Sequence, residues 1–313
     1  MKKTMMVLMM FFSISVILTS GCVDEQSSSD TISDTGDDMI VAVSILPQAE
    51  FVEKIAGDNV KVVVMVPPGA DPHSYEPTPS QLRGLSKAKM YAMVGSGLAI
   101  ETTMMDKIAD LNPGLMIIDC SEGIALREME THAHGDEDEH DAEEETDADH
   151  EGGLDPHIWT SPGNVKIMLN NIYEGLVEID PENESIYLEN KNAYIAELDE
   201  LDGQIKTTLS GKESSSFIVY HPAWGYFADY YGLIEVPVEI EGKEPSVKDM
   251  QKVIDEANEK NIKVIFVQTG FSTVSASAIA NEIGGEVVEV DPLAKDYIDN
   301  LAKVAEAFEK GLA

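Results

Sequence analysis

Two parts of the chain alternate short β-rich segments with segments of helical periodicity. In the first part, Val, Ile, Met and Tyr concentrate in four short runs that we predict to be strands, at 39–46, 60–66, 90–94 and 116–119. Helical patterns are predicted between these runs, at 49–56, at 80–88 and before 116. A βαβ series of this kind is typical of a parallel sheet with helices on both faces.

A long helical region without strand signals follows. Ser161 and Pro162 predict a helix start, with Ser at the N-cap and Pro in the first turn. We expect this helix to reach about residue 179 and to break at Asp180-Pro181. A second helix is predicted to run to about residue 210. It carries an apolar stripe at a spacing of three to four residues, formed by Tyr194, Leu198, Leu201, Ile205 and Leu209.

The alternation resumes in the last hundred residues. Strands are predicted at 217–220, 234–240, 264–267 and 286–290, with helices at 223–231, 246–260, 274–283 and 295–312. The predicted fold is therefore α/β, with two lobes that each contain a mostly parallel sheet flanked by helices. A long rigid linker helix joins the lobes. We place the amino-terminal lobe at 39–162, the linker helices at 163–213 and the carboxy-terminal lobe at 214–313.

The first 38 residues do not follow this pattern. Two lysines precede an apolar run at 5–18, which is too short to span a membrane as a helix and is typical of a secretory signal. Cys22 follows small residues, as in lipoprotein signals, whose cysteine carries lipid at the mature N-terminus. We predict a lipoprotein signal at 1–22 and a disordered tether at 23–38. The alternative is an ordinary cleaved signal with an incidental cysteine.

The composition limits the partners and the metal chemistry. The formal net charge is −37, and two segments without a basic residue, 23–38 and 128–151, hold six and thirteen of the acids. This charge argues against nucleic acid and anionic lipid as partners and favours cations. For the globular surface, a solubility adaptation is the simpler interpretation. Cys22 and Cys120 are the only cysteines, so a metal site would have to use His, Asp or Glu.

Three histidines lie in stiff backbone contexts. Asp-Pro precedes both His73 and His157, and Pro222 follows His221. His73 and His221 follow predicted strands, and Asp291 comes directly after the last one. Because ligands of parallel sheets bind beyond the carboxyl ends of the strands, these side chains predict a four-coordinate zinc site in a cleft between the lobes. The alternatives are packed or surface histidines, and water in place of Asp291.

Four sequence segments resemble the ligand motifs of the cluster A-I solute-binding proteins, the zinc and manganese receptors of ABC importers. They are VPPGADPHSYEPTPS at 66–80, DPHIWTSP at 155–162, YHPAWGYFADYYGL at 220–233 and DPLA at 291–294. The resemblance extends from about residue 39 to the C-terminus. It implies two α/β lobes bridged by a rigid helix, with a metal bound at the lobe interface by His73, His157, His221 and Asp291. Where the family often has Glu after a strand of the second lobe, this chain has Gln268, to which we assign no metal role.

The same resemblance bears on the choice of metal. Manganese members usually have Glu in place of His221, so imidazole there favours Zn²⁺ over Mn²⁺. Zinc members often carry a charged, His-rich loop before the second ligand, and here the acidic loop 128–151 occupies that place. It contains the remaining four histidines, His132, His134, His140 and His150. They predict either a loop that collects zinc and passes it inward or a solvated loop that only adds charge.

The function expected from these features is metal capture outside the cytoplasm and delivery to an ABC permease with its ATPase. We expect a monomer that is not an enzyme and that is anchored to the outer face of the cell membrane through Cys22. Two alternatives stay open at this point. One is a zinc-dependent hydrolase that uses the same histidines with an open fourth position. The other is a surface adhesin with a structural metal.

Overall fold

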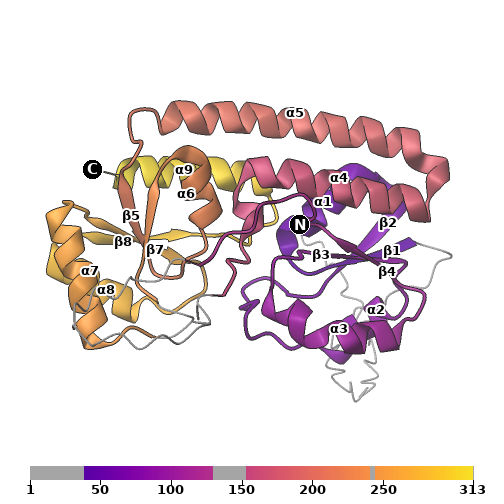
Figure 1. Cartoon of the computed structure of the whole chain (residues 1–313), viewed down its shortest axis with the longest axis horizontal. Helices are drawn as coiled ribbons and strands as arrows, with labels where there is room; N and C mark the ends of the chain where they lie inside the picture. Colours follow the sequence, from indigo (N-terminus) through magenta and orange to yellow (C-terminus); the bar gives the residue numbers. More distant parts are fainter. Residues whose placement is uncertain (1–38, 130–152, 240–243, 313) are drawn as a thin grey trace, which may run out of the picture. The chain divides into compact units, whose positions relative to one another are not determined.

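The two lobes contain parallel sheets with the same strand order. A computed structural model describes residues 39–129, 153–239 and 244–312 of the chain (Figure 1). In the first sheet the order is β2-β1-β3-β4, with β1 at Met39–Val43, β2 at Val60–Val64, β3 at Met90–Met93 and β4 at Met116–Asp119. In the second it is β6-β5-β7-β8, with β5 at Ser216–Val219, β6 at Ile234–Pro237, β7 at Val264–Gln268 and β8 at Glu286–Val290.

Helices pack on both sheets, as the βαβ pattern predicts. The helices before the bridge are α1 (Leu46–Ala56), α2 (Pro79–Leu85), α3 (Ala99–Leu111) and α4 (Pro162–Ile179). Those after it are α6 (Gly225–Tyr231), α7 (Val247–Glu259), α8 (Val274–Ile283) and α9 (Tyr297–Gly311). In the described part of the chain, three 3₁₀ turns complete the order, namely η1 (Gly57–Asn59), η2 (Ile158–Thr160) and η3 (Pro181–Asn183). The α/β fold class with two sheets is confirmed.

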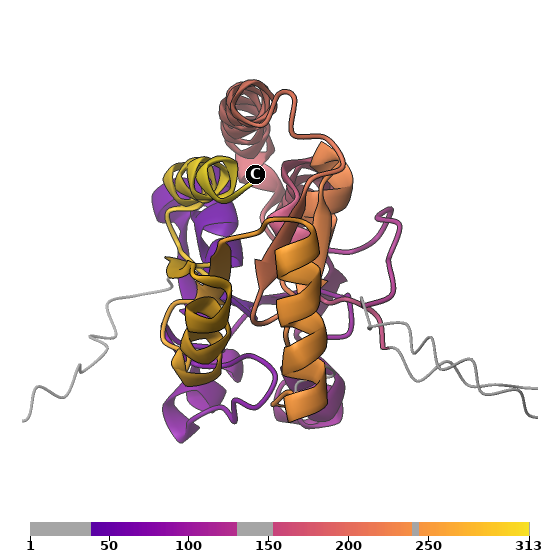
Figure 2. The same ribbon diagram turned by 90° about the vertical axis from the view of Figure 1, so that its left-hand side faces the viewer.

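The bridge between the lobes is α5, which spans Glu184–Thr208. It contacts α1 and α4 at the amino-terminal lobe and α9 at the carboxy-terminal lobe, whereas α4 packs on β3 and β4. Figure 1 shows α5 running above both lobes, and Figure 2 shows it end-on above α9. Because α5 is uninterrupted from one lobe to the other, the chain has no flexible crossover at this bridge.

Some boundaries differ from the sequence prediction by a few residues. The first strand ends at Val43, and Leu46 already begins α1. Pro47 lies in the first turn of that helix, a position where proline is favoured because its missing N–H would have no helical partner. Residues 44–46, which pattern alone assigns to the strand, therefore belong to the turn and the helix.

The larger of the two buried apolar clusters among the described residues extends through both lobes and the bridge, and the smaller lies within the carboxy-terminal lobe. Phe51 of α1, Tyr194 of α5 and Tyr297 of α9 are buried together, with ring centroids 6.3 Å (Phe51–Tyr194) and 5.2 Å (Phe51–Tyr297) apart. The Glu50 carboxylate joins the same three helices. It accepts hydrogen bonds from the Tyr194 hydroxyl at 2.8 Å and the Tyr297 backbone N–H at 2.7 Å. Moving one lobe against the other would therefore expose apolar surface and break buried hydrogen bonds.

Within the described residues, no helix is long and apolar enough to cross a membrane.

Replacing Phe308 of α9 with Ala should lower the free energy of unfolding by ~3–5 kcal/mol, because it leaves a cavity in a fully buried aromatic cluster. The Phe308 ring lies 4.5–5.5 Å from the rings of Phe217, Phe266, Phe227 and Trp224. Chemical denaturation followed by circular dichroism measures the loss. The control F308L keeps most of the volume and should cost less than about 1.5 kcal/mol. An Ala variant as stable as the wild type would contradict this account of the core.

Candidate metal centre

The structure brings His73, His157 and His221 together from separate parts of the chain. His73 lies between β2 and α2, His157 directly precedes η2, and His221 follows β5. Their ring centroids are 5.1–5.4 Å apart, and one ligand atom from each lies within 4.8 Å of the other two. The Nε2 atoms of His157 and His221 are 3.3 Å apart. Of the described residues, only these form a group of three or more His, Cys, Asp or Glu with that spacing.

A repeated turn sets the backbone around the site. The Asp71 carboxylate accepts the backbone N–H of His73 at 2.9 Å, and Asp155 accepts that of His157 at 3.0 Å. Asp291 accepts the N–H of Leu293 in the same way, at 2.8 Å. In all three, Pro stands between the aspartate and the donor and fixes φ. Each Asp-Pro pair therefore closes a local turn that fixes the residue after the proline.

Two carboxylates hold the histidine nitrogens that face away from the cluster. Nδ1 of His157 lies 2.8 Å from Oδ1 of Asp155, and Nδ1 of His221 lies 2.8 Å from Oε2 of Glu239. A proton on Nδ1 satisfies each bond and leaves the lone pair of Nε2 free to bind a metal. The sequence prediction missed Glu239, because this residue is distant from the motifs and follows β6. The Asp-Pro-His tripeptide could have indicated Asp155.

The electrostatics of the site favour neutral imidazoles. Burial, and then repulsion from the other two histidines, lowers the pKa of His73 to about 3. Burial also lowers the pKa of His157, in opposition to its bond with Asp155. Burial by itself would raise the pKa of the Asp155 carboxyl, but its hydrogen bond and charge interaction with His157 lower it. His73 and His157 are therefore uncharged at neutral pH, the state in which imidazole binds a metal.

The Nε2 atom of His73 is buried and has no hydrogen-bond partner. An orphaned polar atom of this kind costs free energy, of the order of 1–3 kcal/mol. A cation bound between the three Nε2 atoms would satisfy it. The donor set, three imidazoles with carboxylates behind two of them, fits Zn²⁺.

Asp291 lies near the histidines but outside their group. It lines a cavity of about 420 Å³ to which both lobes contribute, with Gly69 and Ala70 on one side and Gln268 and Phe271 on the other. The Phe271 ring stacks on His221, with centroids 6.3 Å apart and planes at 18°. Burial raises the pKa of Asp291 above its ordinary value. Its carboxylate oxygens do not meet the 4.8 Å spacing of the three histidines.

The remaining predicted residues lie outside the described part of the chain. They are Cys22 and the loop histidines His132, His134, His140 and His150.

Comparisons with known proteins identify relatives of this chain. The model of the family described as "Zinc-uptake complex component A periplasmic" (ZnuA) matches residues 41–311. The high-affinity zinc uptake system protein ZnuA of Bacillus subtilis is 32% identical over 280 residues, 88% of this chain and 85% of the relative. The manganese-binding lipoprotein MntA of Halalkalibacterium halodurans is 26% identical and covers 95% of both chains.

A crystal structure of ZnuA resembles the described fold. It is 40% identical in sequence, superposes with a TM-score of 0.78, and covers 88% of this chain and 99% of its own. The family match spans nearly the whole folded chain and includes all three clustered histidines. The chain therefore belongs to the ZnuA family of periplasmic zinc-uptake components.

Proposed function

We propose that this protein is the metal-binding receptor of an ABC importer, which captures Zn²⁺ outside the cytoplasm and delivers it to the permease and its ATPase. The observation that carries the proposal is that one ring nitrogen each of His73, His157 and His221 converge at the junction of the lobes, within 4.8 Å of one another. The family description, a periplasmic zinc-uptake component, supports the same function. Zinc is here the transported substrate.

The donor set favours zinc over manganese. Three imidazoles and one further oxygen ligand give the tetrahedral geometry that Zn²⁺ adopts, while Mn²⁺ prefers more oxygen ligands. We propose Asp291 or water as the fourth ligand; the Asp291 carboxylate would have to move closer to the histidines to bind the same ion. The manganese-binding relative supports Mn²⁺ as a second, weaker substrate.

The carboxylates that bind the histidines are placed to orient metal ligands, which suits a metal-binding protein better than an enzyme. A zinc hydrolase needs a general base beside the metal-bound water. Asp155 and Glu239 instead bind the Nδ1 atoms of His157 and His221 and so orient the ligands. We therefore favour a binding protein over a hydrolase, and the family description favours uptake over adhesion as the primary role.

The location outside the cytoplasm agrees with the family description. The lipid anchor on Cys22 and the monomeric state belong to the proposal. The support for an anchor is the Cys22 signal pattern and a relative that is named a lipoprotein. The proposed membrane contact is thus made by lipid, with residues 23–38 as the tether.

His73→Ala and His221→Ala should each lower zinc affinity by at least about 100-fold, because each removes one of three nitrogen ligands. Competition titration with a zinc chelator measures the affinity, and circular dichroism checks the fold. The same alleles should fail to restore growth on limiting zinc in cells that lack their own receptor. Wild-type affinity in both variants would refute the site. Tight binding without restored uptake would refute delivery to an importer.

Glu239→Gln should lower zinc affinity by about 10–100-fold, since the amide no longer provides a charged acceptor for Nδ1 of His221. Glu244→Gln is a matched control on the same segment, because Glu244 accepts from the Tyr220 hydroxyl at 2.5 Å and not from a histidine. The control should bind zinc as the wild type does. Equal affinities in all three proteins would show that the Glu239 hydrogen bond is not needed.

Deletion of residues 129–151 tests the collecting role of the acidic loop with His132, His134, His140 and His150. If the loop binds zinc weakly, the deletion should remove the weak sites and leave one tight site. Isothermal titration calorimetry measures the stoichiometry. An unchanged stoichiometry would show that the loop does not bind zinc and only adds negative charge.

A further inference from the structure

Arg127 lies where the two lobes meet beside the histidines. It is one of only two arginines in the chain. Its side chain is 16% exposed, and its backbone and guanidinium bond to residues of both lobes. Because a guanidinium offers several donors in a fixed geometry, it can join groups that a lysine would reach one at a time.

On the side of the amino-terminal lobe, Arg127 holds Asp155. Its carbonyl accepts the Asp155 backbone N–H at 2.9 Å, and its Nη1 lies 3.3 Å from Oδ2 of Asp155. The other carboxylate oxygen, Oδ1, is the one that binds the backbone N–H and Nδ1 of His157. Asp155 is thus fixed from both sides, with Arg127 on one oxygen and His157 on the other.

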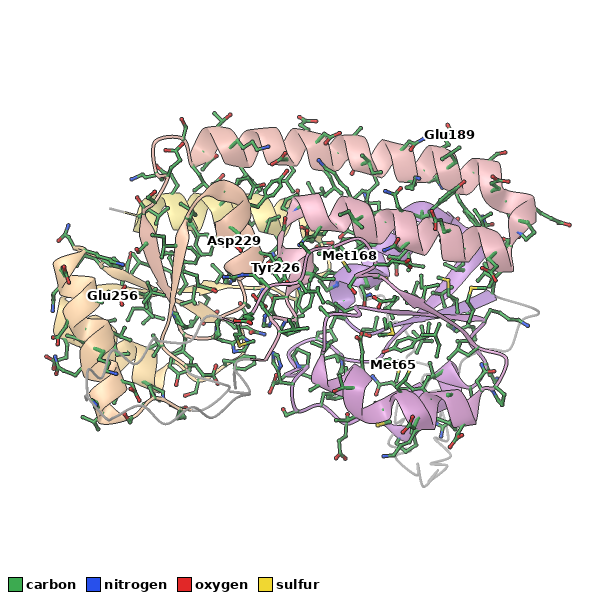
Figure 3. All side chains as sticks on the ribbon, viewed as in Figure 1. Met65, Met168, Glu189, Tyr226, Asp229 and Glu256 are labelled. Atoms are coloured by element: carbon green, nitrogen blue, oxygen red, sulfur yellow. The ribbon has the colours of Figure 1, made fainter. Side chains whose placement is uncertain are left out.

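On the side of the carboxy-terminal lobe, Arg127 holds α6. Its Nε lies 3.0 Å from Oδ2 of Asp229, and its backbone N–H donates to the Tyr226 hydroxyl at 3.0 Å. That hydroxyl in turn donates to the Asp155 carbonyl at 3.2 Å. Tyr226 and Asp229 are labelled in Figure 3. Because α6 begins four residues after His221, these bonds restrain the short segment that contains the His221 backbone.

Gly225, the first residue of α6, makes room for the guanidinium. A Cβ atom at this position would lie 1.4 Å from Nη1 of Arg127 and 2.8 Å from Oδ2 of Asp155. Only glycine lets the helix approach the Arg127–Asp155 pair this closely. The glycine, the arginine and the aspartate form one fitted contact between the lobes.

We propose that Arg127 is a positioning residue that sets the separation of His157 and His221 before metal binds. It does so by tying Asp155, which orients His157, to the helix that follows His221. The inference rests on the proposed metal binding and deepens it, since it names the contact that keeps the ligands of the two lobes at a fixed separation. The ion pair of Arg127 with Asp229 contributes little to this positioning, because the Asp229 side chain is 62% exposed. The ion pair with Asp155 is buried.

Three variants test this role without changing the net charge of the protein. Arg127→Lys keeps the positive charge but loses the several donors of the guanidinium. Gly225→Ala displaces the guanidinium. Tyr226→Phe removes the hydroxyl that bonds Arg127 and Asp155. Matched controls are Arg83→Lys on the exposed surface of α2 and Tyr231→Phe on α6. The buried Tyr231 hydroxyl bonds Asp202 of α5 at 3.1 Å and has no link to a histidine.

The measurements are zinc affinity by chelator competition, zinc dissociation rate, the visible absorption spectrum of the Co²⁺-loaded protein, and thermal unfolding without metal. We expect the three variants to bind zinc about tenfold more weakly or worse. Their zinc dissociation should be faster and their Co²⁺ spectra altered, because the ligand geometry changes. Both controls should stay within twofold of the wild type and keep its spectrum, even though Tyr231→Phe lowers thermal stability.

The proposal is overturned if Arg127→Lys and Tyr226→Phe keep wild-type affinity and an unchanged Co²⁺ spectrum. It is also overturned if Tyr231→Phe weakens zinc binding as much as Tyr226→Phe does, since the effect would then follow stability alone. Gly225→Ala adds to the test when it folds, and the other two variants suffice when it does not. Wild-type protein that binds no zinc would refute the proposed function itself, a result distinct from tight wild-type binding with unaffected variants.

Discussion

The site depends on hydrogen bonds between carboxylates and the outer nitrogens of two histidines. Burial, and then repulsion between the protonated forms of the three imidazoles, lowers the pKa of His73, and its buried Nε2 has no hydrogen-bond partner. Such an arrangement is unfavourable without metal and persists only if its surroundings fix it. Asp155 and Glu239 supply that constraint by holding Nδ1 of His157 and His221, while the Asp-Pro turns hold the backbone. The ligands are thus already ordered when the protein folds, so metal binding does not have to supply the free energy of ordering them.

The fold provides the matching constraint at the scale of the lobes. Both sheets are parallel, and His73 and His221 follow a strand of the first and the second sheet, so the site lies beyond the carboxyl ends of strands, where parallel sheets bind ligands. The lobes share the larger apolar cluster, in which Phe51, Tyr194 and Tyr297 pack together and Glu50 of α1 accepts hydrogen bonds from α5 and α9. A wide hinge motion would open this core. We therefore expect metal binding to require only small local shifts of the side chains at the junction.

Much of this was predictable from the sequence because it is encoded locally. The βαβ periodicity gives the fold class, and the Asp-Pro-His tripeptides and strand-terminal His221 indicate three residues that the structure brings together. Glu239 and Arg127 were not predictable, because their partners are distant in the chain and depend on how β6 and α6 pack. Asp291 shows the limit of a motif: its Asp-Pro turn forms as expected, yet the same turn would form whether or not the carboxylate binds a metal. The boundary at Leu46 was missed since Pro47 permits a helix start inside an apolar run.

The shared core has a consequence for the lifetime of the protein outside the cell. When two lobes have separate cores, one can open while the other keeps its ligand, and a protease can cut the open half. Here the buried residues around Phe51 come from both lobes and the bridge, so opening either lobe disrupts this shared cluster, while a second cluster lies within the carboxy-terminal lobe. A ligand that binds only the folded state stabilises the parts of the chain that open together with the shared cluster. We therefore expect the metal-free protein to be cleaved around this cluster more readily than the metal-bound protein.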